Sequence, residues 1–114
     1  FKTAPKIGPE DFLINWNMSA ESIFNRIRGL SPKPGACSTF EGRKIKIIEA
    51  LFENTDHKYE PGTVIESDQK KGILRVAAGS GILKVIRLQP ESRPVTDTRS
   101  FLNGNRIVEG GIFV

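Results

Sequence analysis

GILRVAAGSGILKVIRLQPES, residues 72–92, is the stretch of sequence that decides the fold. Leu74, Val76 and Ala78 share one phase of a period of two, which is typical of a strand with one buried face. The triplet Gly79-Ser80-Gly81 lets the chain reverse, and an apolar run, Ile82–Leu88, returns. The sequence therefore predicts an antiparallel hairpin here.

More strands are expected before the hairpin. Ala36–Phe40 leads into the turn signal Glu41-Gly42, and Arg43–Asn54 follows with alternating polar and apolar residues. The alternation slips by one residue at Ile47-Ile48, which indicates a β-bulge. A further short strand is expected over Thr63–Glu66. Because bulges bend strands, this pattern favours a small curved barrel over a flat sheet.

One helix has clear signals ahead of these strands. Ser19 is a suitable N-cap, and Ile23, Ile27 and Leu30 recur at the spacing of a buried helical stripe. Gly29 is expected to end this helix in the left-handed conformation.

A second, short helix is expected near the end of the chain. Asp97 or Thr98 would cap it, and Gly104 would close it, while 106–114 would add a last edge segment. The elements together predict a mainly β fold: a small OB-like β-barrel with one N-terminal helix and a short C-terminal helix.

Length and composition fit a single domain. Residues 11–114 would form the barrel, whereas residues 1–10, FKTAPKIGPE, have the composition of an interdomain linker. The first residue is Phe1 and not Met, so we expect a processed chain or a fragment. The sequence has no apolar run of roughly 18 residues that would span a bilayer. A lone cysteine, Cys37, fits the reducing cytoplasm. We expect a monomer.

Positive charge is concentrated at the start of the chain. The net charge is +4, and residues 1–46 hold eight Lys and Arg against four Asp and Glu, whereas residues 47–114 hold nine of each. A local basic surface indicates a polyanionic partner. The alternative is an ordinary solvated surface.

Residues for catalysis are sparse. His57 is the only histidine and lies in a polar loop, and the sequence has no His/Cys cluster with metal-ligand spacing. The carboxylates are scattered, and Gly79-Ser80-Gly81 lacks the helix and Lys-Ser/Thr pair of a phosphate loop. We therefore expect no catalytic, cofactor or metal site on this chain.

Several segments in the right order resemble the C-terminal domain of methionyl-tRNA formyltransferase. The resemblance runs from about Thr3 to Ile107 and includes the hairpin stretch quoted above. Its other segments are TAPKI at 3–7, INW at 14–16, IRGLSPKPGA at 27–36, PGTVIES at 61–67 and RSFLNGNRI at 99–107.

The resemblance implies an OB-like barrel joined by a linker to an N-terminal, Rossmann-type catalytic domain. Such an enzyme transfers a formyl group from 10-formyltetrahydrofolate to the methionine carried by initiator tRNA. The catalytic Asn, His and Asp belong to the N-terminal domain, so this chain alone is expected to be inactive. Its expected partners are the initiator tRNA, through the phosphate backbone, and that N-terminal domain.

The resemblance also implies where tRNA is bound. Lys2 and Lys6 match basic linker positions, and Arg43, Lys44 and Lys46 match the early barrel. Lys33 is a further candidate, standing between two prolines where the family commonly has an aromatic residue. Asn15 stands where an aspartate is usual.

Two other interpretations stay open. Sugar-nucleotide formyltransferases and formyltetrahydrofolate dehydrogenases carry similar domains, which would be scaffolds that do not bind tRNA. A free-standing RNA-binding module is the third possibility, but the linker-like start argues against it.

Overall fold

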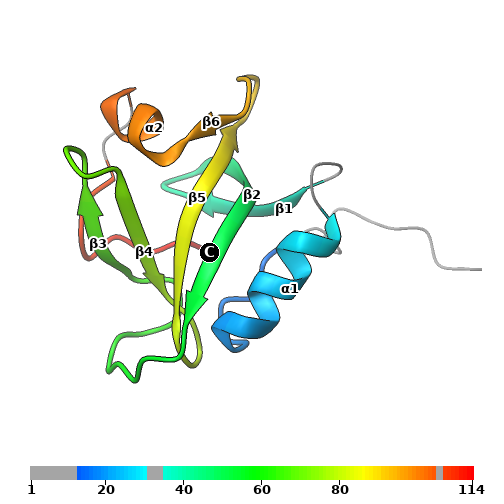
Figure 1. Ribbon diagram of the computed structural model, residues 1–114, viewed down its shortest axis with the longest axis vertical. Helices are drawn as coiled ribbons and strands as arrows, with labels where there is room; N and C mark the ends of the chain where they lie inside the picture. Colours follow the sequence, from blue (N-terminus) through cyan, green and yellow to red (C-terminus); the bar gives the residue numbers. More distant parts are fainter. Residues whose placement is uncertain (1–12, 31–34, 105–106) are drawn as a thin grey trace, which may run out of the picture.

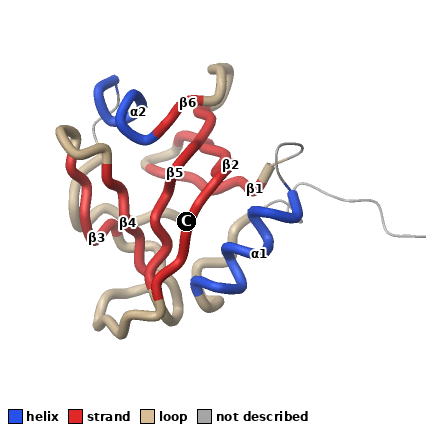
Figure 2. Tube along the Cα trace, viewed as in Figure 1, coloured by secondary structure: helices blue, strands red, loops and turns tan. Residues whose placement is uncertain are grey.

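The computed structural model describes residues 13–30, 35–104 and 107–114. Strands make up most of the body, and two helices lie at its periphery (Figure 1, Figure 2). The elements in chain order are α1 Ala20–Leu30, β1 Ala36–Phe40, β2 Arg43–Glu53, β3 Val64–Asp68, β4 Ile73–Ala77, β5 Ile82–Pro90, β6 Thr96–Asp97 and α2 Thr98–Gly104. The predicted mainly β fold with one helix near each end is confirmed. Within the described residues, neither helix has the length and apolar character needed to cross a bilayer.

The predicted hairpin forms the β4–β5 pair. The strands of the sheet are ordered β1-β2-β5-β4-β3, every pair is antiparallel, and β6 adds to β5. Gly81 has a φ of 78°, a left-handed conformation that glycine adopts without steric cost, and its carbonyl accepts the N–H of Ala78 at 3.1 Å. The hairpin thus supplies the long strand β5, on which β2, β4 and β6 all pair.

The predicted bulge is also present. The register of β2 against β5 shifts between Ile47 and Glu49 and again between Glu49 and Ala50. Ile45, Ile47 and Ala50 are buried, so the bulge keeps apolar side chains on the inner face across the phase slip.

The barrel is half-closed. β1 and β3 are the two edges of the sheet, and they do not pair with each other. Residues 110–114, the closing segment, bridge these edges: Val114 exchanges two 2.9 Å hydrogen bonds with Thr39, and Val64 donates its N–H to Gly111 at 2.8 Å. The sheet itself is therefore open, and the closing segment joins its two edges by isolated bridges. Of the last edge segment predicted over 106–114, the pairing is confirmed for residues 110–114.

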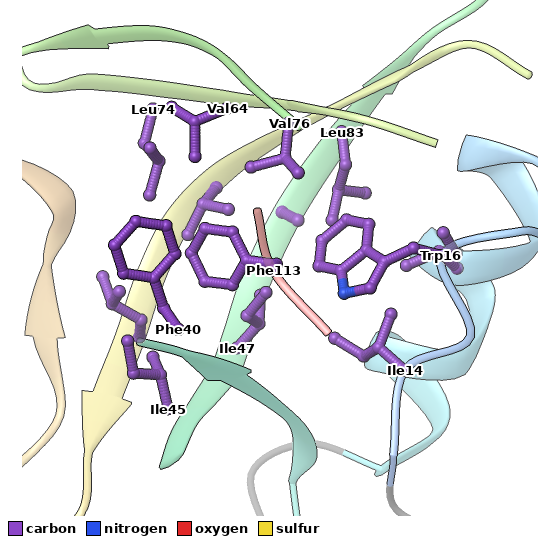
Figure 3. Packing of buried hydrophobic residues seen from close by; sticks show 14 of the residues in the cluster. Ile14, Trp16, Phe40, Ile45, Ile47, Val64, Leu74, Val76, Leu83 and Phe113 are labelled. Atoms are coloured by element: carbon purple, nitrogen blue, oxygen red, sulfur yellow. The ribbon is translucent and has the colours of Figure 1, made fainter. Parts of the chain in front are cut away.

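Three aromatic rings fill the interior at this closure. Phe113 lies between Phe40 and Trp16, with ring centroids 4.8 and 5.7 Å away (Figure 3). The indole N–H of Trp16 donates to Ser38 Oγ at 2.9 Å, and Ser38 Oγ donates to the Val114 carbonyl at 2.9 Å. All three rings are buried. Trp16 and Phe40 are therefore core residues and cannot stack on bases.

Helix α1 covers β2 beside this core (Figure 1). Its N-cap is Ser19, as predicted, because Ser19 Oγ accepts the N–H of Ser22 at 3.1 Å. Ile23 and Ile27 are buried, and each contributes about 1.5–3 kcal/mol by leaving water. The prediction that Gly29 ends the helix is wrong. Gly29 is helical, and the left-handed residue is Gly35, which donates its N–H to the Leu30 carbonyl at 2.8 Å.

Helix α2 is capped by Asp97 and fastened to β5. Asp97 Oδ1 accepts the N–H of Ser100 at 2.8 Å, and this hydrogen bond lowers the pKa of the Asp97 carboxyl. Thr98 Oγ1 donates to the Val85 carbonyl at 2.6 Å. Of the two predicted caps, Asp97 is therefore the cap, and Thr98 anchors the helix.

We expect Phe113→Ala to destabilise the protein by about 3–5 kcal/mol, because it leaves a cavity and removes two ring contacts. Denaturant unfolding measures the loss. Val114→Ala, whose side chain is 71% exposed, is the matched control and should change stability by less than about 0.5 kcal/mol. A loss below about 1 kcal/mol for Phe113→Ala would show that the ring does not hold the barrel together.

Candidate nucleic-acid interface

Three of the predicted cations follow a tight turn at the start of β2. Glu41 and Gly42 have φ values of 51° and 81°, so both central residues of the β1–β2 turn are left-handed, as a twisted two-residue hairpin requires. This turn sets the register of β2 against β1, and Arg43 pairs with Phe40 directly after it. The side chains of Arg43, Lys44 and Lys46, here called the basic face, are all exposed.

Strand pleating explains why the two lysines point the same way. Ile45 and Ile47 are buried at 4% and 1% exposure, so Lys44 and Lys46 must point outward. Residues two apart on a strand are roughly 6–7 Å apart, which is close enough for both ammonium groups to act on neighbouring phosphates. Thr39 and Cys37 lie opposite them on β1, and Gln89 lies opposite Lys46 on β5.

The basic face lines two adjoining hollows. The larger is about 640 Å³ and the smaller about 250 Å³, and Lys44, Pro90 and Glu91 line both. Arg43 lines the larger hollow, and Lys46 lines the smaller. The other lining residues are Ile45, Arg93, Pro94, Thr96, Ser100, Phe101 and Gly104 in the larger hollow, and Cys37, Gln89 and Ser92 in the smaller.

A rigid turn over residues 90–93 stands between the hollows. Glu91 donates its N–H to the Lys44 carbonyl at 3.1 Å, which fastens the turn to β2. Arg93 donates its N–H to the Pro90 carbonyl at 3.1 Å, and Gln89 Nε2 donates to the Arg93 carbonyl at 2.8 Å. Ser92 has a φ of 63°, a conformation that costs a non-glycine residue of the order of 1 kcal/mol.

The structure brings together only part of the predicted set. Lys44 and Lys46 point to the same side of β2, and Arg43 lies beside them at the turn, whereas Lys2, Lys6 and Lys33 lie outside the described residues. Arg93 was missed as a candidate because it is far from them in sequence and follows a strand in a proline-containing loop. Its position between Ser92 and Pro94, in a turn that must be exposed, was the available signal.

His57 has a structural role. Its Nε2 lies 2.9 Å from the Ala78 carbonyl, and its Nδ1 accepts the N–H of Tyr59 at 3.1 Å. Both ring nitrogens are therefore engaged by the backbone, and the ring ties the β2–β3 loop to the end of β4. Across the described ranges, no three His, Cys, Asp or Glu side chains gather as a metal site would need.

Another part of the sheet has its charges balanced by ion pairs. Arg75 binds Glu53 through two hydrogen bonds of 2.7 and 3.1 Å, and it binds Glu66 at 3.2 Å. The hydrogen bond from Arg75 lowers the pKa of the Glu53 carboxyl. This arginine therefore joins β2, β4 and β3, and its charge is compensated within the fold.

Comparison with known proteins gives consistent sequence matches. The family model described as "Formyl transferase, C-terminal domain" matches residues 6–106. Methionyl-tRNA formyltransferase of Dictyoglomus thermophilum is 44% identical over 112 residues, which are 96% of this chain and 36% of that protein. The enzymes of the same name from Lactococcus lactis subsp. cremoris and Rickettsia canadensis are 40% and 43% identical, over 89% and 96% of this chain and 32% and 34% of theirs. The chain thus spans about a third of these relatives.

Solved structures share the fold at lower identity. HypX from Aquifex aeolicus in complex with tetrahydrofolic acid superposes with a TM-score of 0.69 at 14% identity, covering 97% of this chain and 22% of that one. A multiply substituted variant of the same protein gives 0.68 at 16% identity, over 89% and 18%. At this identity the likeness shows the fold alone.

We expect Arg75→Met to cost about 1 kcal/mol and to weaken the acid sensitivity of the fold, as measured by denaturant unfolding across pH. Glu53 has a lowered pKa, so its contribution is present above the ordinary value of 4.5 and is lost as pH falls through the folded-state pKa. The variant should lose less stability on acidification than the parent.

Arg87→Met is the matched control, because its pair with Glu49 is longer, at 3.5 Å, and both side chains are more than half exposed. It should change the pH profile less than Arg75→Met does, because Arg87 acts on Asp97 and Glu49 only at exposed sites. Equal pH profiles for Arg75→Met and the parent would contradict a stabilising role for the Glu53–Arg75 pair.

Proposed function

This chain belongs to the formyl transferase C-terminal domain family, and we propose that it is the tRNA-binding C-terminal domain of a methionyl-tRNA formyltransferase. Relatives of that name are 40–44% identical over most of the chain. The complete enzyme would transfer formyl from 10-formyltetrahydrofolate to the methionine of initiator tRNA. Folate would bind to the preceding catalytic domain, and this domain would hold the tRNA.

The observation that carries this proposal is the basic face. Lys44 and Lys46 point outward from a strand whose other face is core, and Arg43 precedes them at the turn. Lys and Arg side chains contact phosphate oxygens without regard to sequence, and each contact releases counterions. Such an interface would hold the phosphate backbone of the tRNA while the acceptor end of the tRNA reacts on the catalytic domain.

The second candidate is a scaffold domain in a related folate-dependent enzyme that does not use tRNA, such as a sugar-nucleotide formyltransferase or a formyltetrahydrofolate dehydrogenase. The observation that favours this second candidate is the fold shared with HypX, a protein of another name that is only 14–16% identical. The architecture therefore occurs in more than one kind of protein. The much higher identity to methionyl-tRNA formyltransferases, together with the paired outward lysines, favours tRNA.

The same proposal assigns the parts of the chain. Residues 1–10 would link the barrel, residues 11–114, to the catalytic domain, and Lys2, Lys6 and Lys33 would contribute further contacts to the tRNA. The chain would be monomeric, would work in the cytoplasm and would have no formyltransferase activity by itself.

We expect Lys44→Glu with Lys46→Glu to weaken binding of initiator tRNA by at least about tenfold and to lower the slope of log affinity against log salt by about two. Binding of the 114-residue chain is measured by fluorescence anisotropy from about 50 to about 200 mM salt. Both side chains are exposed, so the fold should persist, which thermal unfolding checks.

The matched control makes the same charge change at two exposed loop lysines that line neither hollow, Lys58→Glu with Lys70→Glu. It should weaken binding less and lower the salt slope less. Equal effects of the two double variants would mean that only net charge matters. No binding by the parent chain at low salt would sink the proposal.

We also expect bound tRNA to protect Cys37 from alkylation. Cys37 is the single cysteine, is half-buried, and lines the smaller hollow with Lys44 and Lys46. Mass spectrometry of the chain after timed exposure to iodoacetamide measures the rate with and without tRNA. A cysteine placed at the far loop, Lys58→Cys in a Cys37→Ser background, should react equally fast in both cases. Unprotected Cys37 at saturating tRNA would place the RNA elsewhere.

A further inference from the structure

Cations from two different elements line the larger hollow: Arg43 and Lys44 from β2, and Arg93 from a later loop. Arg43 comes from the start of β2, and Arg93 comes from the loop between β5 and β6, about fifty residues later in the chain. We propose that this hollow seats the sugar-phosphate backbone of the RNA and that Arg93 is one of its phosphate contacts. This inference rests on the proposed function, and it extends the proposed RNA interface from the basic face to the larger hollow and Arg93.

The size and lining of the hollow fit this occupant. Its volume of about 640 Å³ lies in the range of small-molecule sites, large enough for a phosphate with its ribose. Thr96 and Ser100, two residues with hydroxyl side chains, are among the lining residues, and hydroxyls are common partners of phosphate oxygens. Ile45 and Phe101 also line the hollow and are buried at 4% and 3% exposure, so they offer a base little apolar surface on which to stack. The RNA backbone therefore rests on the hollow and does not insert a base into it.

The backbone of Arg93 is held in place before any RNA arrives. Its N–H is bound to Pro90, its carbonyl accepts from Gln89, and Pro94 follows it. A backbone that is already ordered loses less conformational entropy when the side chain engages a phosphate. The β5–β6 loop is thus a fixed second wall facing the basic face.

Glu91 is the one acidic residue among the residues that line the two hollows. It lines both, beside Lys44, and its side chain is exposed. A carboxylate at this place repels phosphate and lowers the local positive potential. Removing its charge should therefore tighten RNA binding, whereas removing the charge of Arg93 should weaken it.

The test compares Arg93→Gln, Glu91→Gln and Lys58→Gln for initiator tRNA binding across the same salt series. We expect Arg93→Gln to bind about three- to tenfold more weakly at low salt, with a salt slope reduced by about one. Glu91→Gln should bind severalfold more tightly. Lys58→Gln is the matched control, because the β2–β3 loop lies at the opposite end of the molecule from the β5–β6 loop (Figure 1), and it should behave as the parent.

The outcomes separate this inference from the proposed function. Salt-dependent binding by the parent together with unchanged affinity and slope for Arg93→Gln would overturn the seat in the larger hollow and leave the function standing. No binding by the parent would overturn both. If Arg93→Gln and Lys58→Gln weakened binding equally, the effect would be one of net charge, and the inference would be wrong. Thermal unfolding of each variant verifies that the turn still folds.

Discussion

The half-closed barrel depends on Phe113. This one side chain sits between Phe40 and Trp16, while its backbone neighbours bond to both edge strands, β1 and β3. An open antiparallel sheet leaves two rows of unpaired backbone groups, which is a structural liability. The closing segment satisfies part of both rows and inserts a large ring into the space between them. Burial of the ring and pairing of the edges therefore support each other.

This closure determines which surface is left for a partner. Because Ile45 and Ile47 face the enclosed interior, the alternate residues Lys44 and Lys46 face solvent. The bulge after Ile47 then restores the apolar face for Ala50 without turning the lysines inward. One side of β2 thus contributes to the core, and the other side carries the two lysines. Their positive charge therefore lies on a strand of the sheet and not on a loop.

Local signals predicted the elements well where they acted through neighbours in the chain. The Gly79-Ser80-Gly81 reversal, the Ser19 cap and the phase slip at Ile47-Ile48 each depend on a few adjacent residues, and all three are confirmed. Gly29 failed because α1 continues to Leu30 and the left-handed residue is Gly35. The short strand β6 was missed because two residues, Thr96 and Asp97, show no periodicity and pair only because β5 extends beside them.

The sequence by itself determined the mainly β class, the helix positions, the outward phase of Lys44 and Lys46, and the family resemblance, because these reside in local pattern and residue order. Only the tertiary structure decided that Trp16 and Phe40 are core, that the chain's last residues close the barrel, and that Arg93 shares a hollow with Arg43. Each of these joins residues far apart in sequence. Contacts between such residues depend on the order of the strands and on the volume that the sheet encloses. Neither can be predicted from the spacing of neighbouring residues in the sequence.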